Sequence, residues 1–272
     1  IYDKRAARQA LFDCKYGEDH RGCPQNNDKF VIMVNLLIDA GNTSIKLAVY
    51  ADDTISDEVR CDENSLPGCV DGLRRLFGDF DVAAVSDVRG MGEDTYNYIE
   101  SVCGKVVKVK GDSDLPIKNM YGTPQTLGAD RICAAVGAYS LFPGKDCVII
   151  DFGTAITFDF LTSRGEFLGG NISPGLDTRF RALNHFTGKL PLLERVDSVE
   201  LVGNSTTGAM ESGVILGTLF EIEGYIRTYP GYNFIFTGGD AIFFAEKLKS
   251  PIFVVCNLVL MGLSQIAKTD AV

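Results

Sequence analysis

The chain has 272 residues, of which 46% are hydrophobic and 23% charged, so it is long enough to bury one or two globular cores. A net charge of −10, no long Lys/Arg run and no apolar stretch that could cross a bilayer argue against a nucleic-acid or membrane partner, and eight scattered cysteines without a C-x-x-C pair favour a reducing cytoplasm. Because only two histidines are present, His20 and His185, proton transfer in any reaction would have to use a carboxylate.

Residues 1–32 show no clear periodicity and no secretory signal, whereas Met33 directly precedes the first good strand. We therefore expect Met33 to be the natural start and residues 1–32 to be an added or disordered extension. The alternative is a genuine N-terminal arm with a helix around residues 5–12.

Strands and helices alternate from residue 35 to residue 109, which favours an α/β layered domain. The expected strands cover residues 35–39, 45–50, 54–60, 82–85 and 105–109. The expected helices cover residues 64–77, where apolar residues recur at helical spacing, and 95–102. Residues 111–126 are polar and carry two prolines, so we expect a long loop there. This loop divides the chain into a domain of residues 33–125 and a domain of residues 126–272.

The second half is predicted to begin with an Ala-rich helix over residues 127–141, followed by a strand–turn–strand unit over 148–160 and a strand over 164–168. Residues 169–175 are expected to form a glycine-rich turn, with Ser173 as the cap and Pro174 as the first residue of the next helix. Further helices are expected over residues 204–228, after residue 240 and over 258–267. Strands are expected over 232–236 and 251–255.

One turn occurs twice, at residues 36–43 and at residues 148–155, and each copy is an apolar strand that ends in Asp-x-Gly. Glycine lets backbone N–H groups approach an anion closely, and a carboxylate beside a phosphate is reasonable if it holds a cation. Two facing hairpins could therefore grip the phosphates of a nucleotide. The alternative is that both Asp side chains only cap their turns. Neither a Walker A nor a G-x-G-x-x-G motif is present, which disfavours P-loop and Rossmann folds.

A second unusual cluster precedes and opens the Ala-rich helix, at residues 121–131. Asp130 lies in the first turn, where it could cap the helix or accept the proton of an attacking hydroxyl. Arg131 could bind a substrate carboxylate in bidentate fashion.

Two facing hairpins in duplicated halves resemble the nucleotide site of the actin/sugar-kinase/Hsp70 superfamily. Four motifs sharpen this resemblance: D-x-G-N-T at 39–43, Y-x-x-P-x-x-L-G-x-D-R at 121–131, D-x-G-T-A-x-T-x-D at 151–159 and G-G-x-I-x-P-G at 169–175. From Met33 onwards the chain resembles the type III pantothenate kinases, bacterial enzymes of coenzyme A biosynthesis. The fold implied is α/β, with two duplicated ribonuclease H-like (actin-like ATPase) domains and a nucleotide cleft between them.

The resemblance implies ATP-dependent phosphorylation of pantothenate to 4'-phosphopantothenate, with Asp130 as the catalytic base. The residues that it assigns to ATP are Asp39, Ala40, Gly41, Asn42, Thr43, Ser44, Ile45, Lys46, Gly153, Thr154, Gly238 and Gly239. Those that it assigns to pantothenate are Tyr121, Gly128, Ala129, Asp130, Arg131 and Thr206. Asp151 would hold a monovalent cation, K⁺ or NH₄⁺, and Asp39 would help to hold Mg²⁺, directly or through water. The family works as a homodimer with the substrate near the subunit interface.

Two other functions remain open at this point. The chain could be a non-catalytic regulator that kept the fold, although the intact Asp39, Asp130, Arg131 and Asp151 and the acidic charge argue against this. It could also be a kinase of the same superfamily that acts on a sugar or acetate, which fold alone would not exclude. One departure from the family pattern is Asp87, where relatives usually have a small residue.

Overall fold

The structure is a computed structural model that describes residues 33–270, so the expectations for residues 1–32 lie outside the described residues. Its first sheet contains β1 (Asn35–Ala40), β2 (Ile45–Ala51), β3 (Thr54–Ile55), β4 (Val59–Cys61), β5 (Phe80–Asp87) and β6 (Cys103–Lys108). Its second sheet contains β7 (Lys118–Asn119), β8 (Cys147–Phe152), β9 (Ala155–Leu161), β10 (Glu166–Pro174), β11 (Asn233–Gly238) and β12 (Ile252–Val254). The expected α/β class is therefore confirmed.

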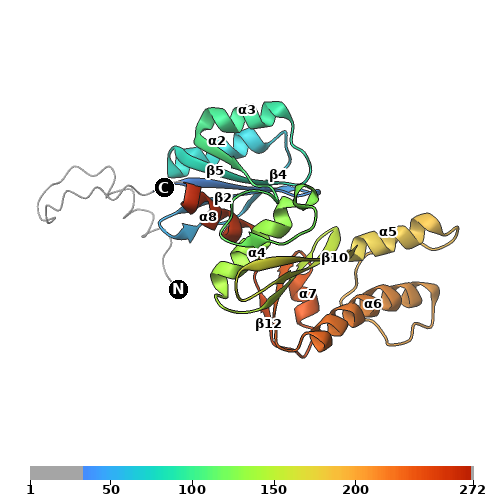
Figure 1. Cartoon of the computed structure of the whole chain (residues 1–272). Coiled ribbons are helices and arrows are strands. Elements are labelled where there is room, and N and C mark those ends of the chain that lie inside the picture. The colour runs from blue at the N-terminus through green and yellow to red at the C-terminus, as the bar shows by residue number, and fades with distance from the viewer. Residues whose placement is uncertain (1–32, 271–272) are drawn as a thin grey trace, which may run out of the picture. The chain divides into compact units, whose positions relative to one another are not determined.

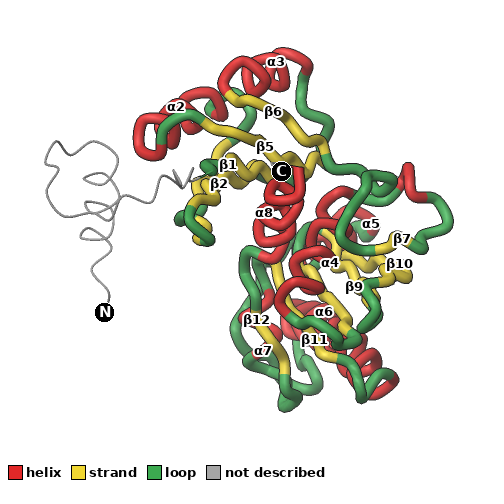
Figure 2. Tube along the Cα trace, turned by 60° about the vertical axis from the view of Figure 1, so that its left-hand side comes forward, coloured by secondary structure: helices red, strands yellow, loops and turns green. Residues whose placement is uncertain are grey.

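The helices pack in layers around these sheets (Figures 1 and 2). They are α2 (Leu66–Phe77), α3 (Glu93–Val102), α4 (Ala129–Leu141), α5 (Leu176–Phe186), α6 (Thr206–Thr228), α7 (Ala241–Ala245) and α8 (Leu258–Asp270), with a 3₁₀ turn at Pro124–Thr126. One core lies between the first sheet and α2 and α3, and another lies between the second sheet and α5, α6 and α7. A third core joins α4 and α8 to the inner faces of both sheets. Within residues 33–270, no helix is long and apolar enough to cross a membrane.

The two sheets share one pairing pattern. In the first, β1 pairs antiparallel with β2 and parallel with β5, and β6 extends the parallel side. In the second, β8 pairs antiparallel with β9 and parallel with β11, and β12 extends the parallel side. Asp39 and Asp151 each occupy the fifth position of a six-residue strand, so the repeated sequence occupies the same place in both sheets.

Strands β1 and β8 are each buried on both faces of their sheet, which explains their continuous apolar sequences. In β1, Leu36 and Ile38 face α2 and α3, whereas Leu37 faces the central core. In β8, Val148 and Ile150 face the outer helices, whereas Ile149 faces the central core. The ends of these strands are thus held between layers, which fixes the turns that follow them.

The prediction of a glycine-rich turn at residues 169–175 is wrong, because β10 continues through this segment to Pro174. The helix that follows begins at Leu176 with Gly175 as its cap, so neither Ser173 nor Pro174 has the predicted helical role. Glycines occur in this strand because neighbouring atoms approach its backbone closely. A Cβ at Gly170 would lie 1.9 Å from the carbonyl oxygen of Phe158.

Helices α4 and α8 cross in close contact between the sheets, as Figure 2 shows. A Cβ at Gly262 would lie 1.8 Å from the carbonyl oxygen of Cys133, and a Cβ at Gly137 would lie 2.5 Å from that of Leu258. The crossing therefore depends on two positions without side chains. Helix α8 also packs on β1 and β5, although it follows every strand of the second sheet in the chain.

Asp87, the departure noted in the sequence, organises the turn between β5 and α3. Its carboxylate accepts hydrogen bonds from the backbone N–H groups of Arg89, Gly90 and Met91 and from the Tyr96 hydroxyl. The Asp87 side chain therefore stabilises the connection between β5 and α3.

Candidate active site

The two Asp-x-Gly turns, which belong to different sheets, meet each other. Each glycine N–H closes its own turn, Gly41 onto the Ser44 carbonyl at 3.2 Å and Gly153 onto the Ala155 carbonyl at 3.1 Å. The hydroxyl oxygens of Thr43 and Thr154 are 3.3 Å apart. Both hydroxyls are exposed. Two sets of small polar groups thus converge at one place, as a phosphate-binding site requires.

Asp39 lies directly behind the first turn and is 6% exposed. Burial raises its pKa to about 6; Lys46 opposes this shift and the charge of Asp130 adds to it. The nearer carboxylate oxygen is 3.7 Å from the Lys46 ammonium, whereas Oδ1 has no hydrogen-bond partner in the described part of the chain. An unpartnered buried carboxylate oxygen is unfavourable, so this atom is suited to a cation or to a water bound by one.

Asp151 has the equivalent position behind the second turn, and burial raises its pKa to about 7, with Asp130 adding to the shift and Lys46 opposing it. Its Oδ1 lies against Gly238, where a Cβ would be only 2.4 Å away. Gly238 also has a φ of +88°, which glycine adopts without strain. The N–H of Gly239 donates to the Phe152 carbonyl at 2.9 Å, so the Gly238–Gly239 turn is held beside Asp151.

Asp130 is half-buried in the first turn of α4. Its Oδ1 accepts the backbone N–H of Arg131 at 2.8 Å, and a Cβ at Gly128 would lie 2.5 Å from the same oxygen. Burial raises the pKa of this carboxyl, although the hydrogen bond and charge of Arg131 oppose the shift. This contact uses one oxygen, so the other can still accept a proton. Gly128 is the cap residue of α4 and no side chain of the described residues caps the helix, so Asp130 contributes to the helix start only as a negative charge in its first turn.

Arg131 reaches β9 of the second sheet, where it forms an ion pair with Asp159 that is almost fully buried. Its Nε lies 3.0 and 3.1 Å from the two carboxylate oxygens, and its Nη2 lies 2.5 Å from Oδ1. The guanidinium carbon is 5.6 Å from the centre of the Tyr121 ring. The predicted bidentate contact with a substrate carboxylate would therefore have to share the guanidinium with Asp159, because Nε and Nη2 already donate to that residue. Asp159 was part of a sequence motif, but nothing in the sequence assigned it this contact.

The carboxylates of Asp39, Asp130 and Asp151 influence one another electrostatically, since Asp130 raises the pKa of both of the others. Lys46 offsets only part of this negative charge. Among residues 33–270, no three His, Cys, Asp or Glu side chains are arranged to hold one metal ion together. A cation here would therefore also use other oxygens, such as those of backbone carbonyls, water or a bound phosphate.

These pKa shifts predict how stability changes with pH. The pKa values of Asp39 and Asp151, about 6 and about 7, exceed the usual 3.8, so between about pH 4 and pH 7 the folded chain binds more protons than the unfolded chain. Stability from these groups is therefore greatest at low pH and is lost as the pH rises through that window.

In a thermal melt without added cations, Asp151→Asn should weaken the fall in melting temperature between about pH 5 and pH 8. A cation that binds the ionised carboxylates should raise the wild-type melting temperature at the higher pH and have little effect at the lower one, where the carboxyls are protonated. If the melting temperature of Asp151→Asn fell with pH as it does in the wild type, Asp151 would not be the source of the pH dependence.

Thr206 is not brought to this group of residues. It is exposed at the first position of α6, after the cap Ser205, and no hydrogen bond within the described residues joins it to Asp130 or Arg131. In Figure 1, α5 and α6 extend together away from the second sheet. Of the residues predicted for the substrate, Tyr121, Gly128, Ala129, Asp130 and Arg131 therefore lie together and Thr206 lies apart.

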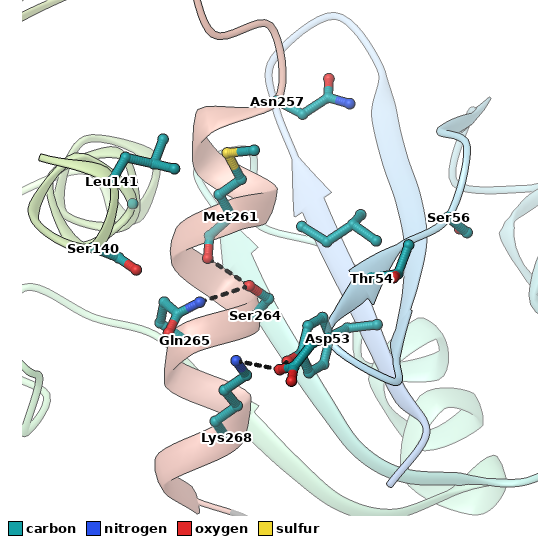
Figure 3. A pocket seen from close by; sticks show the side chains of 13 residues that line it. Asp53, Thr54, Ser56, Ser140, Leu141, Asn257, Met261, Ser264, Gln265 and Lys268 are labelled. Atoms are coloured by element: carbon teal, nitrogen blue, oxygen red, sulfur yellow. Dashed lines mark hydrogen bonds and ion pairs between the residues drawn. The ribbon is translucent and has the colours of Figure 1, made fainter. Parts of the chain in front are cut away.

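A separate pocket of about 390 Å³ lies between the β2–β3 hairpin, α4 and α8 (Figure 3). Lys268 and Asp53 form an ion pair there with 2.9 Å between Nζ and Oδ1. This pocket is at the end of β2 opposite to the β1–β2 turn, and no predicted site residue lines it. The chemistry is therefore assigned to the two turns and not to this pocket.

Comparison with known proteins agrees with this geometry. The protein from Bacteroides fragilis strain YCH46 named type III pantothenate kinase is 41% identical over 239 residues, which cover 86% of this chain and 97% of that protein. The protein of the same name from Cytophaga hutchinsonii is 39% identical over 238 residues, which cover 86% of this chain and 98% of that protein.

Solved structures show the fold alone at their lower identities. A Campylobacter jejuni protein described as a Baf family transcriptional activator has a TM-score of 0.61 at 22% identity, over 86% of this chain and 98% of that one. The activator of 2-hydroxyisocaproyl-CoA dehydratase from Clostridium difficile, with bound ADPNP, has a TM-score of 0.53 at 15% identity. The match covers 88% of this chain and 95% of that one. These neighbours have the actin-like ATPase fold. The family model for type III pantothenate kinase matches residues 35–228, and the chain belongs to the type III pantothenate kinase family.

Proposed function

We propose that this chain transfers the γ-phosphoryl group of ATP to pantothenate, forming 4'-phosphopantothenate in the first step of coenzyme A biosynthesis. Family membership supports the substrate and the reaction. The observation that carries the mechanism is the convergence of the two Asp-x-Gly turns, which meet at Thr43 and Thr154. The likeness to the Campylobacter jejuni protein concerns the fold alone and gives the regulator alternative no support.

ATP is assigned to the cleft between the turns. Residues 39–46, Gly153 and Thr154 surround the phosphates, and the Gly238–Gly239 turn contacts the adenosine side. The exposed hydroxyls of Thr43 and Thr154 are suitable donors for phosphate oxygens. Lys46 adds a positive charge next to Asp39.

Two cations fit the carboxylates behind the turns. Asp39, whose Oδ1 is unpartnered, would hold Mg²⁺ directly or through water, and Asp151 would hold K⁺ or NH₄⁺. When bound, these ions offset the negative charge of the phosphates and of the three carboxylates. The absence of a three-ligand group among the described residues is consistent with ions that also use phosphate and water oxygens.

Asp130 acts as the general base. It accepts the proton of the pantothenate hydroxyl while the hydroxyl oxygen attacks the γ-phosphorus in line. The new oxygen–phosphorus bond forms as the bond to ADP breaks. The backbone N–H of Arg131 donates to Oδ1 of Asp130, which restrains this carboxylate at the start of α4. Tyr121, Gly128, Ala129 and Arg131 bind the substrate beside it.

The shared pairing pattern supports a division of the chain into two duplicated ribonuclease H-like domains, residues 33–125 and 126–272. The exchange of α8 onto the first sheet and of β7 onto the second ties the halves together.

The active form is proposed to be a cytoplasmic homodimer. Large apolar side chains on β10, α5 and α6 are exposed and available for a second copy, notably Ile172, Phe186 and Phe220. Thr206, exposed at the start of α6, then belongs to a substrate site near the subunit interface.

The reaction is tested by measuring ADP release by the full chain. Release should require pantothenate, and omission of potassium should lower it by at least about tenfold, because fixed charge in the cleft would remain unneutralised. Asp151→Asn should remove the response to potassium. Asp146→Asn is the matched control, since it changes the same residue type at the other end of β8, where Asp146 accepts the Ser163 N–H. ADP release that is independent of pantothenate would contradict the proposed function.

A further inference from the structure

Asp159 is the most deeply buried charged side chain beside the candidate site, at 1% exposure. It lies on β9, where alternation places Ile156 and Phe158 in the outer core and Asp159 on the face toward α4. A carboxylate on a covered face needs a partner, because burial of an unpaired charge is strongly unfavourable. Arg131 supplies that partner from the first turn of α4, next to Asp130.

The strand beside Asp159 is shaped to admit this pair. Gly170 is directly opposite Asp159 in the sheet, and a Cβ there would lie 2.7 Å from the Asp159 carboxylate. Gly169 has a φ of +98°, and a Cβ there would lie 2.8 Å from the Tyr121 ring. The two glycines therefore leave room for Asp159 and Tyr121, and both of these side chains contact Arg131.

This arrangement limits which atoms of Arg131 can meet a ligand. Asp159 accepts hydrogen bonds from Nε and Nη2, and the Tyr121 ring lies near the guanidinium, so Nη1 is the one guanidinium nitrogen without a hydrogen bond to Asp159. A planar guanidinium held along one edge has a defined direction for the opposite edge. We propose that Asp159 is a positioning residue that fixes Arg131 so that its remaining edge receives the carboxylate of the substrate. This inference rests on the proposed function, which supplies a substrate with a carboxylate.

If the role of Asp159 were mainly electrostatic, its removal would change the affinity for pantothenate in the opposite direction. If Asp159 mainly neutralised Arg131, its removal would leave an uncompensated positive charge and strengthen the binding of an anionic substrate. If Asp159 positions Arg131, its removal weakens binding, since a displaced guanidinium loses directed hydrogen bonds to the carboxylate. The direction of the change in pantothenate affinity therefore separates the two roles.

The experiment is calorimetric titration of pantothenate and, separately, of an ATP analogue into wild type and Asp159→Asn. The pantothenate dissociation constant should rise by about ten- to a hundredfold, the range of a lost hydrogen bond to a charged group. The dissociation constant of the ATP analogue should change by less than about twofold, because Asp159 is not among the residues assigned to ATP. Asp146→Asn, on the neighbouring strand end, should change neither constant. Unchanged or tighter pantothenate binding in Asp159→Asn would overturn the inference.

A double-mutant cycle with Arg131→Met keeps the test informative if Asp159→Asn folds poorly. Replacement of both members of a buried ion pair is tolerated better than loss of one, so Arg131→Met/Asp159→Asn should melt above Asp159→Asn. In the Arg131→Met background, Asp159→Asn should no longer change pantothenate affinity, whereas an independent contribution of similar size would refute action through Arg131. Asp159→Glu, which retains the charge, should recover part of the affinity. If wild type binds ATP but neither binds nor phosphorylates pantothenate, the proposed function fails instead.

Discussion

Asp130→Asn should lower kcat for pantothenate phosphorylation by about 100- to 10,000-fold, the usual contribution of a general base. Asparagine keeps an oxygen that can accept the Arg131 N–H, so the start of α4 should stay folded. It cannot accept the proton of the attacking hydroxyl. The measurement is ADP release at saturating ATP and pantothenate, together with the dissociation constants of both ligands, which should change far less than kcat.

Asp94→Asn is a matched control for this experiment. Asp94 is the second residue of α3, as Asp130 is the second residue of α4, and both lie in the first turn of a helix. A helix-capping role would make the two substitutions similarly mild, at about 1 kcal/mol or less in stability and without a selective effect on kcat. Equal activity of Asp130→Asn and Asp94→Asn would therefore reject Asp130 as the base.

Gly262→Ala should destabilise the protein by at least about 2 kcal/mol, at the upper end of what overpacking costs. The added methyl group would lie 1.8 Å from the Cys133 carbonyl oxygen, which is backbone and cannot rotate away. Helices α4 and α8 would have to separate, and both contact the central core. Denaturant unfolding monitored by circular dichroism measures the loss.

The control for the helix crossing is Gly72→Ala in α2, where nothing lies within 4 Å of an added Cβ. Here alanine should stabilise the helix by about 0.5–1 kcal/mol, because glycine is the poorer helix former. If both substitutions changed stability in the same direction and by similar amounts, the close crossing would not be what Gly262 provides.

The features that the sequence predicted well are local ones. The Asp-x-Gly turns depend on an apolar run, a carboxylate and a glycine within eight residues, so Asp39 and Asp151 could be paired by pattern alone. The helix predicted from apolar periodicity at residues 64–77 corresponds to α2, and α4 and α6 each begin two residues after the predicted start. The assignments of individual residues to ATP, cations and substrate remain predictions.

The features that the sequence could not reveal depend on long-range contacts. Gly169 and Gly170 resembled a turn because glycine is common in turns, yet here they admit Tyr121 and the Phe158 carbonyl against a strand. Asp159 occurs at an alternating position that usually faces solvent. It is buried because α4, nearly thirty residues earlier, covers that face of β9. Neither relation is encoded in local spacing.

The return of α8 to the first sheet has a consequence for how the chain is made. Residues 35–108 form the first sheet, but the helix that packs on β1 and β5 begins at Leu258. During synthesis from the N-terminus, α4 can reach this inner face early, but the part that α8 covers stays open while about 150 further residues are added, at about 5–20 residues per second. The first half can therefore complete its packing only after α8 has been made, and until then the ribosome-bound intermediate exposes apolar strands that a chaperone could bind.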